Sequence, residues 1–282
     1  MTSRSTEIEI LILGAGWTST FLIPLLKAEN ISYEATTTTG RDDTTKWRFD
    51  PDSDDSESYR RLPRAKTILV TFPVKGKGQY EKLLSTYSTT HAHMLSNWIQ
   101  LGSTGIFTGE GWNDRHSPYD TSNLRAMAED ELLEQGGCVL NLAGLYGGTR
   151  EPRNWVSRVA KDKEQLKNKK ALHLIHGDDV ARAIVAMHKR FYAGERWLLT
   201  DLIVHDWWKL VWDWADSLEA EWKGAEEDKP QYKKWVQECM NEEDVRALPR
   251  SIELLGRVLD SRDFWNAMKM RPSRSIVTRS SL

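Results

Sequence analysis

The feature that most constrains this chain is a short apolar strand that runs directly into a glycine turn and then a helix. Residues 7–13 read EIEILIL, a pattern typical of a buried parallel strand, and a helix is expected over 18–29. Between them, Gly14 permits a tight turn and Gly16 lets backbone amides approach a pyrophosphate. A third glycine is replaced by Ser19, which is small enough for the helix to pack closely on the strand. This unit predicts a dinucleotide site.

Strand-like and helix-like segments alternate over the first 145 residues. Further strands are expected at 31–39, 46–49, 66–72, within 97–107 and at 138–142, and helices at 79–89 and 121–135. The alternation predicts an α/β fold with a doubly wound parallel Rossmann sheet. We expect a dinucleotide-binding core over 1–145 and a smaller, mainly helical C-terminal substrate lobe over 146–282. Segments near 171–176 and 196–200 are expected to return to the core, with a helix at 178–191 between them.

Composition excludes several classes of partner. A net charge of −2 with dispersed lysine and arginine offers no basic field for nucleic acid. No stretch approaches the roughly 20 apolar residues of a membrane span, and the polar N-terminus lacks the apolar core of a signal peptide. The two cysteines have neither CxxC nor Cys/His spacing, so neither a disulfide nor a metal site is predicted. We expect a cytoplasmic protein whose partner is a small molecule.

The end of the second strand bears on the choice of cofactor. A carboxylate there would hold the ribose 2′-hydroxyl of NAD, but the sequence is a run of threonines followed by Gly40 and Arg41. Hydroxyl groups and a guanidinium suit a 2′-phosphate better, because arginine forms charge-assisted bonds to it. Thr38 and Arg41 therefore favour NADP. NAD stays open as an alternative, since Asp42 and Asp43 follow immediately.

Five motifs in series resemble one superfamily. They are Leu13-Gly14-Ala15-Gly16-Trp17, Thr71-Phe72-Pro73, Ser103-Thr104-Gly105-Ile106-Phe107, Leu142-Ala143-Gly144-Leu145-Tyr146-Gly147 and His176-Gly177-Asp178-Asp179-Val180-Ala181. In this order they resemble the extended short-chain dehydrogenase/reductases, in particular the atypical branch that is similar to sugar-nucleotide epimerases. The resemblance covers residues 11–205, and the tail beyond matches only loosely.

The resemblance implies roles for particular residues. The cofactor-binding residues would be Gly14, Gly16, Trp17, Thr18, Thr38, Arg41, Thr71, Phe72, Pro73 and Leu145. Ser103 would donate a hydrogen bond to the substrate carbonyl, and Leu145 and Tyr146 would lie near the nicotinamide end. His176 belongs to a motif that is mostly structural in such proteins.

One departure from the superfamily concerns its proton relay, Tyr-x-x-x-Lys. The lysine position falls on Arg125, which could still anchor ribose, but the tyrosine position falls on Thr121, whose hydroxyl is too weak an acid. Tyr119 or His116, from the preceding loop, would then have to supply the proton. We take Ser103, Tyr119 and Arg125 as the candidate catalytic residues.

Three functions remain open. The first is an NADP-dependent oxidoreductase that transfers hydride to or from a small carbonyl or imine. The second is a nucleotide-binding regulator resembling the NmrA group, and the third is a non-redox isomerase or cyclase that uses the nucleotide structurally. In the lobe, Trp207, Val211, Trp214 and Leu218 share a helical face. The tryptophan rings form either part of the core or the wall of an apolar substrate pocket. A homodimer through the helices expected at 79–90 and 121–135 also stays open.

Overall fold

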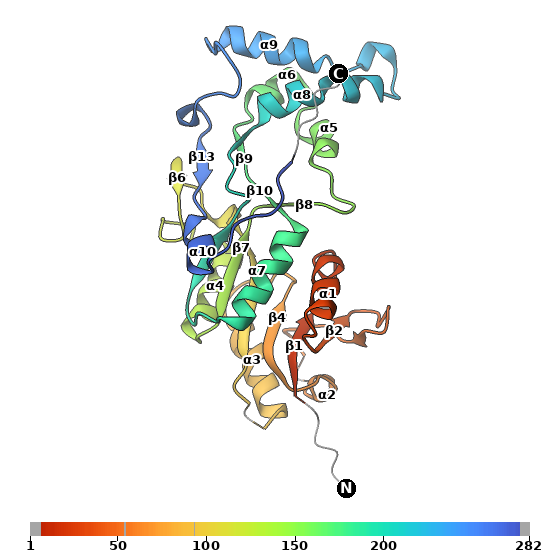
Figure 1. Cartoon of the computed structure of the whole chain (residues 1–282), viewed down its shortest axis with the longest axis vertical. Coiled ribbons are helices and arrows are strands. Elements are labelled where there is room, and N and C mark those ends of the chain that lie inside the picture. The colour runs from red at the N-terminus through yellow and green to blue at the C-terminus, as the bar shows by residue number, and fades with distance from the viewer. Residues whose placement is uncertain (1–6, 54, 93, 277–282) are drawn as a thin grey trace.

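The computed structural model describes residues 7–53, 55–92 and 94–276, so the expectation about the extreme N-terminus lies partly outside the described residues. At its centre is a seven-stranded sheet in the order β11-β7-β5-β4-β1-β2-β3 (Figure 1). All neighbouring strands are parallel. The strands are β1 (Ile8–Leu13), β2 (Tyr33–Thr37), β3 (Thr45–Lys46), β4 (Ala65–Val70), β5 (Asn97–Ser103), β7 (Cys138–Leu142) and β11 (Arg196–Leu199).

The strand order reverses between β1 and β4. From β1 the chain builds outward to β2 and β3, then crosses back to β4 and builds outward in the other direction. Leu13 and Val70 pair at the carboxyl ends of the two strands. In open parallel sheets of this kind, ligands bind in the crevice outside such a reversal. The fold therefore places the glycine turn after β1 where a ligand is expected.

Helices cover both faces of the sheet, which confirms the doubly wound prediction. On one face, α1 (Ser19–Ala28), α7 (Gly177–Lys189) and α10 (Arg262–Ala267) bury one set of strand side chains, such as Ile10 and Ile12. On the other face, α2 (Glu57–Arg60), α3 (Gln79–Thr90) and α4 (Leu124–Glu134) bury the alternate set, such as Leu11 and Leu13. Successive residues of β1 are thus buried on opposite faces, as the unbroken apolar run predicted.

A smaller lobe lies beyond the carboxyl edge of the sheet, at the top of Figure 1. It contains α5 (Val156–Val159), α6 (Lys163–Lys167), α8 (Trp207–Ala220) and α9 (Tyr232–Glu242). Its apolar core includes Trp207, Trp208 and Trp214 of α8. Within the described ranges, none of the helices combines the length and the apolar character needed to cross a membrane.

Three short strand pairs connect the lobe to the sheet. They are β8 (Gly144–Tyr146) with β10 (Leu174–His176), β9 (Ala171–Leu172) with β12 (His205–Asp206), and β6 (Gly111–Asn113) with β13 (Arg257–Leu259). β11 joins the edge of the central sheet, whereas β9 and β10 pair outside it. No local pattern announced the β6–β13 pair, because its strands are three residues long and far apart in the sequence.

Several elements are shorter than the sequence predicted, among them α4, β2 (expected over 31–39) and the third strand. α4 begins at Leu124, not at 121, because Asn123 caps it by accepting a hydrogen bond from the Arg125 amide. The third strand is only Thr45–Lys46. The residues 47–49 that were expected to continue it line a cavity described below.

Candidate functional site

The turn after β1 is built around a glycine with a left-handed backbone. Gly14 has φ of +91°, and a Cβ there would lie 2.9 Å from Thr71 Oγ1 and 3.0 Å from Phe72 Cδ1. Thr71 follows β4 and hydrogen-bonds the Gly14 carbonyl. The close approach of the segment after β4 therefore requires glycine at this position. Thr71 and Phe72 thus lie against the turn, and Pro73 follows at the surface.

Three amides of the turn, those of residues 16–18, have no acceptor within the described residues. Gly14 and Ala15 donate to Thr36 at the end of β2, but in the described part of the chain no group accepts from the amides of Gly16, Trp17 or Thr18. They precede the first turn of α1, where unpaired amides and the helix dipole attract anions. Such a cluster can hold a diphosphate.

Ser19 occupies the position of the missing third glycine. It is 4% exposed, and its hydroxyl has no partner among the described residues. The residue is small enough for α1 to pack against the sheet, as the sequence suggested. The serine at this position leaves one buried hydroxyl without a hydrogen-bond partner among the described residues.

The end of β2 presents threonine and arginine, not a carboxylate. Thr36 and Thr37 are buried and hydrogen-bonded within the turn region, whereas Thr38 is exposed. Arg41 reaches back across the turn and donates from Nη2 to the Ala15 carbonyl at 3.2 Å. Its guanidinium is only loosely paired, with 3.8 Å between its Nη1 and Asp42 Oδ2. An arginine therefore stands beside the free amides.

A cavity of about 260 Å³ opens beside the turn. Its lining residues are Gly14, Thr36, Thr38, Trp47, Arg48, Phe49 and Phe72. Phe49 and Phe72 stack with their ring centroids 6.2 Å apart. An apolar, aromatic slot at this place suits a flat base such as adenine. Sequence reasoning missed Trp47, Arg48 and Phe49, because it assigned them to a strand.

Ser103 and Arg125 come from β5 and α4, and neither lines the cavity beside the turn. Ser103 ends β5, and its hydroxyl accepts from the Gly105 amide at 3.1 Å, which leaves its own proton free to donate. Arg125 is the second residue of α4, is half-exposed, and forms no ion pair among the described residues. Thr121, at the tyrosine position of the superfamily's relay, lies before the helix and is exposed.

A buried network supports the end of β5. The Asn141 amide donates to the Ser103 carbonyl and to Glu129, and Arg196 pairs with Glu129. Burial raises the pKa of the Glu129 carboxyl despite the neighbouring guanidinium. A Cβ on Gly102 would lie 2.4 Å from Glu129 Oε1, so position 102 must be glycine to leave room for the Glu129–Arg196 ion pair.

Tyr119, one of the candidate catalytic residues, is hydrogen-bonded to a carboxylate of α4. Its hydroxyl donates to Asp130 of α4 at 2.7 Å, and its ring packs against Phe107 and beneath the Arg196 guanidinium. Burial and the hydrogen bond to Asp130 raise the pKa of Tyr119. The phenol therefore belongs to the hydrogen-bonded network of Arg196 and Asp130, and its role as proton donor stays a prediction.

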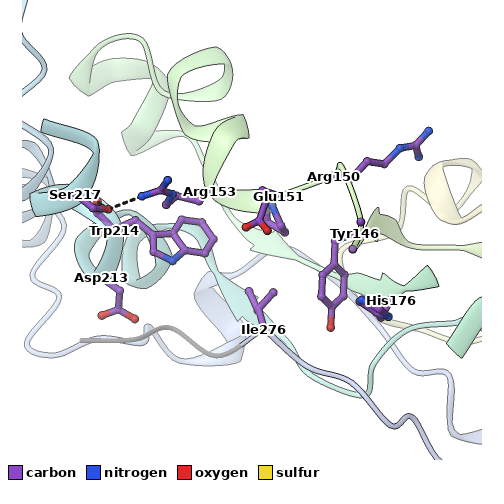
Figure 2. A pocket seen from close by; sticks show the side chains of 12 residues that line it. Tyr146, Arg150, Glu151, Arg153, His176, Asp213, Trp214, Ser217 and Ile276 are labelled. Carbon is purple, nitrogen blue, oxygen red and sulfur yellow. Dashed lines mark hydrogen bonds between the residues drawn. The ribbon is translucent and has the colours of Figure 1, made fainter. Parts of the chain in front are cut away.

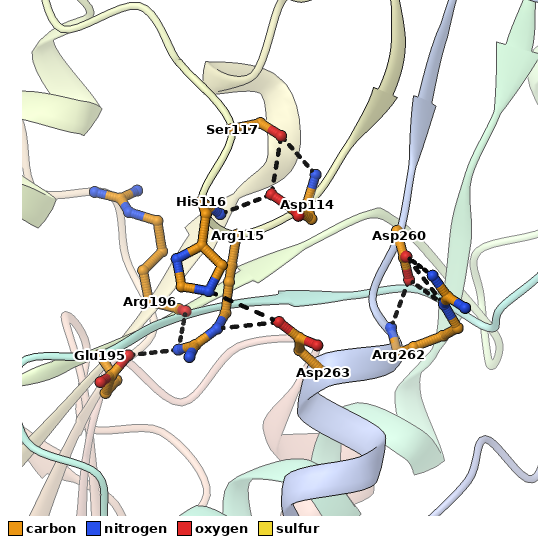
Figure 3. A network of polar contacts seen from close by, with 9 residues as sticks. All are labelled: Asp114, Arg115, His116, Ser117, Glu195, Arg196, Asp260, Arg262 and Asp263. Carbon is orange, nitrogen blue, oxygen red and sulfur yellow. Dashed lines mark hydrogen bonds and ion pairs between the residues drawn. The ribbon is translucent and has the colours of Figure 1, made fainter.

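His116 lies in a different network (Figure 3). Its Nε2 is 3.9 Å from Asp263 of α10, and Arg115 beside it pairs with Glu195 and Asp263. These contacts hold the 114–117 loop against α10 and the start of β11. The local sequence could not reveal this, because both carboxylates come from distant segments.

The loop after β8 meets the phosphate turn. Trp17 Nε1 donates to the Gly147 carbonyl at 3.3 Å, and the Arg150 guanidinium lies 4.4 Å from the Trp17 ring centroid. Leu145, in the middle of β8, pairs with Ile175 of β10. The Trp17 side chain thus joins the turn to the segment that enters the lobe, a contact that the sequence motifs alone did not show.

A larger cavity of about 570 Å³ lies where core and lobe meet (Figure 2). This junction cavity is lined by Tyr146, Gly147, Gly148, Arg150, Glu151, Pro152, Arg153, His176, Asp213, Trp214, Ser217 and Ile276. Trp214 belongs both to the lobe core and to this wall. The interpretation of these rings as core is thereby confirmed, and a role for Trp214 in a substrate pocket stays a prediction.

Comparisons with known proteins agree with this geometry. No family model and no curated protein matches the chain. Among solved structures, a functionally unknown conserved protein from Silicibacter pomeroyi has 15% identity, a TM-score of 0.64, and coverage of 95% of this chain and 94% of its own. The dTDP-glucose 4,6-dehydratase of Bacillus anthracis, in complex with NAD, has 12% identity, a TM-score of 0.58, and coverage of 95% and 92%.

The protein RMD of Pseudomonas aeruginosa, complexed with NADPH, has 11% identity, a TM-score of 0.59, and coverage of 95% of each chain. The fold is that of the epimerase- and dehydratase-like Rossmann proteins. The likeness to these structures confirms the predicted Rossmann-type fold. Identities of this size do not carry an activity from one Rossmann protein of this type to another.

Proposed function

We propose that this chain binds a nicotinamide dinucleotide, NADP in preference to NAD, and uses it as an oxidoreductase on a small carbonyl or imine. The observation that carries the proposal is the set of unpartnered amides of Gly16, Trp17 and Thr18 at the start of α1. The aromatic cavity lies directly beside them, at the carboxyl ends of β1, β2 and β4. A diphosphate on the amides and an adenine in the cavity would occupy adjoining places.

The preference for NADP is supported by charge. Arg41 stands over the turn, Arg48 lines the cavity, and Thr38 at the same rim is exposed. A 2′-phosphate would gain charge-assisted hydrogen bonds from guanidinium groups, whereas a free ribose would find no carboxylate at the end of β2. The solved neighbours include complexes with NAD and a complex with NADPH, so the preference for NADP has to be tested on this chain itself.

When bound, the nicotinamide supplies or accepts the hydride. The residues of the chain would then bind and orient. Ser103, with its proton free, would donate a hydrogen bond to the substrate oxygen or nitrogen, and Arg125 would place positive charge near the ribose. An imine would need less from an acid, because it can enter already protonated.

The proposal is tested by calorimetric titration of the purified chain with NADPH, NADP⁺, NADH and NAD⁺. We expect binding of all four, with the phosphorylated forms at least tenfold tighter. A panel of aldehydes, ketones and imines, followed by loss of NADPH absorbance, then tests turnover. Failure of every nucleotide to bind at millimolar concentration would refute the proposal outright.

One observation favours a second function. Thr121, which the resemblance puts at the tyrosine position of the superfamily's relay, is exposed ahead of α4, and the Tyr119 hydroxyl is hydrogen-bonded to Asp130. A nucleotide-binding regulator, or an isomerase that keeps the nucleotide as a wall, needs no such relay. Tight binding without turnover, together with unequal affinity for oxidised and reduced forms, would favour the regulator. Retained activity with a redox-inactive nucleotide analogue would favour the isomerase.

A further inference from the structure

An apolar groove lies at one side of the molecule, where β6 and β13 pair (Figure 1). This flank groove has a volume of about 590 Å³, and its apolar lining consists of Trp112, Leu202, Val204 and Leu259. Trp112 is 57% exposed, and Leu202 and its neighbour Ile203 are 45% and 39% exposed. Large apolar side chains that gather at one exposed place usually mark an interaction surface. The flank groove shares no lining residue with the junction cavity or with the cavity beside the turn.

The loop that carries Leu202 is held in a strained conformation. Leu202 has φ of +63°, a left-handed backbone that is unfavourable for leucine. Its amide donates to Thr200 Oγ1 at 3.0 Å, and the Ile203 amide donates to Asp201 Oδ1 at 3.2 Å. Thr200 and Asp201 are buried, and the other Asp201 oxygen lies 3.2 Å from His205 Nε2. The fold therefore fixes a conformation that presents an apolar side chain to solvent, as a preorganised binding surface does.

The segment that carries Trp112 is equally well fixed. Trp112 is the central residue of β6 and is in register with Val258 of β13. The side-chain amide of the next residue, Asn113, is buried and donates to the carbonyls of Gly109 at 2.8 Å and Gly111 at 2.9 Å. An aromatic ring on a fixed backbone loses little entropy when it is covered, and such rings are the usual anchors of protein interfaces.

The rim of the flank groove carries one charge of each sign. Asp260 and Arg262 line the groove and pair with each other (Figure 3), and the Arg262 side chain is 74% exposed. A partner with a strong charge of either sign would gain nothing from such a rim. Two copies of it do not repel, and a two-fold arrangement allows each guanidinium to face the carboxylate of the other copy. The rim is therefore complementary to itself.

The helices that the sequence left open as a dimer face are less suited to association. The exposed residues of α3 are Glu81, Ser85 and Thr89, all of them polar. In α4 the exposed residues are Leu124, at the first position, and Glu134, at the last. Neither helix offers an apolar surface comparable with the flank groove.

We propose that a second copy of this chain docks on the flank groove about a two-fold axis. Trp112 and Leu202 of each copy then pack into the groove of the other, so one surface supplies both the exposed apolar side chains and the hollow that receives them, as an isologous contact requires. The apolar centre provides the affinity, and Asp260 and Arg262 at the rim fix the orientation. The inference does not depend on the proposed function.

The test is sedimentation velocity of the full chain from about 1 to about 200 µM. Because the groove and its rim form a small interface, we expect a dimer with Kd of about 10 µM, seen as a rise from 32.5 kDa to twice that mass. Trp112→Lys should weaken the dimer at least a hundredfold, since the substitution enters a two-fold contact twice. Trp222→Lys, at a partly exposed tryptophan of the lobe, is the matched control and should dimerise like the parent.

A second variant guards against a folding defect. Leu202→Asn removes the apolar side chain, and asparagine tolerates the left-handed backbone better than leucine does. We expect this variant to melt no lower than the parent at the lowest concentration, and to dimerise at least tenfold more weakly. Leu95→Asn, at a fully exposed leucine before β5, is its control and should dimerise like the parent.

Charge reversal tests whether the partner is a second copy held in this orientation. Arg262→Glu and Asp260→Lys each give the rim charges of one sign, so each variant alone should dimerise about tenfold more weakly than the parent. An equimolar mixture of the two variants should form a mixed dimer at least tenfold tighter than either variant forms alone. Circular dichroism checks that both variants are folded, because Asp260 also accepts from the Arg262 amide.

Three outcomes would overturn the inference. One is a parent chain that keeps its monomer mass at the highest concentration, which would leave the flank groove to another protein or to a small apolar molecule. Another is a dimer that Trp112→Lys and Leu202→Asn form as readily as the parent. The third is a dimer that Leu124→Lys abolishes while the groove variants retain it, which would place the contact on α4. NADPH titration of the same samples should give the parent affinity throughout, so the failure of either proposal leaves the other standing.

Discussion

The phosphate turn allows fold and ligand binding to be perturbed separately, with one methyl group at each of two glycines. In Gly14→Ala the new Cβ would meet Thr71 Oγ1 at 2.9 Å and Phe72 Cδ1 at 3.0 Å, on a backbone with φ of +91°. In Gly16→Ala the nearest atom is the Gly14 carbonyl oxygen at 3.9 Å, and φ is not left-handed. The first substitution is strained and crowded, while the second projects into open space.

The magnitudes follow from these contacts. At Gly14, a left-handed backbone costs an L-residue about 1–2 kcal/mol and overpacking costs about 1–3 kcal/mol, against a gain of about 0.4–1 kcal/mol from the stiffer unfolded chain. We expect Gly14→Ala to lower the free energy of unfolding by about 3 kcal/mol. For 282 residues, with about 2.1 cal/mol/K of unfolding entropy each, this lowers Tm by roughly 5 °C.

Gly16→Ala should leave Tm within about 1 °C of the parent, since its methyl meets nothing. Its methyl would instead stand where a diphosphate must approach the amides, so we expect NADPH to bind about tenfold more weakly. The assays are thermal unfolding by circular dichroism or calorimetry and calorimetric titration with NADPH. Equal Tm values for the two variants would refute the packing argument, and unchanged NADPH affinity in Gly16→Ala would refute the assignment of the amides.

Three further predictions concern charged groups. Arg196→Met leaves the Glu129 carboxylate, which is 3% exposed, without its cation, and should lower the free energy of unfolding in urea by about 3–5 kcal/mol. Arg262→Met removes an exposed ion pair and should lower it by less than about 1 kcal/mol. Equal losses in the two variants would contradict the stabilising role of the buried ion pair. Burial lowers the pKa of His173 to about 3, below its value in the unfolded chain. The unfolded state therefore binds the proton first, and the free energy of unfolding falls as the pH drops below about 6.5, by about 2 kcal/mol at pH 5. His173→Gln should flatten that slope in urea unfolding at several pH values, and an unchanged slope would assign it elsewhere. Arg41→Ala should weaken NADPH about tenfold and NADH about twofold or less; equal weakening of both would remove Arg41 from 2′-phosphate recognition.

Much of the fold could be predicted from local sequence. The strand ahead of Gly14, the turn and the following helix are contiguous, and their apolar pattern and glycines act over a few residues. The same holds for the alternation that gave the doubly wound sheet. Boundaries were less predictable, because α4 begins where the Asn123 side chain happens to cap it, three residues after the start of its helical pattern.

In the candidate site, too, only the features that depend on local sequence could be predicted. Gly14 and Thr71 were expected from their motifs to lie together, and they meet at the sheet's reversal, where the left-handed backbone and the close approach of Thr71 dictate glycine at position 14. The proton donor could not be assigned by position. Tyr119 was chosen for its spacing from Ser103, but its hydroxyl donates a hydrogen bond to Asp130, and spacing does not reveal which partner a hydroxyl finds.

What the sequence by itself determined is the element order and the phosphate turn, since both depend on interactions within one strand–turn–helix unit. Only the tertiary structure decided that Trp47 and Phe72 form a slot, and that Tyr146, His176 and Trp214 surround one cavity. Trp47 and Phe72 are 25 residues apart in the sequence, and Tyr146 and Trp214 are 68 residues apart. Their meeting depends on how the sheet, the lobe and the connecting strand pairs pack, which no short stretch of sequence encodes.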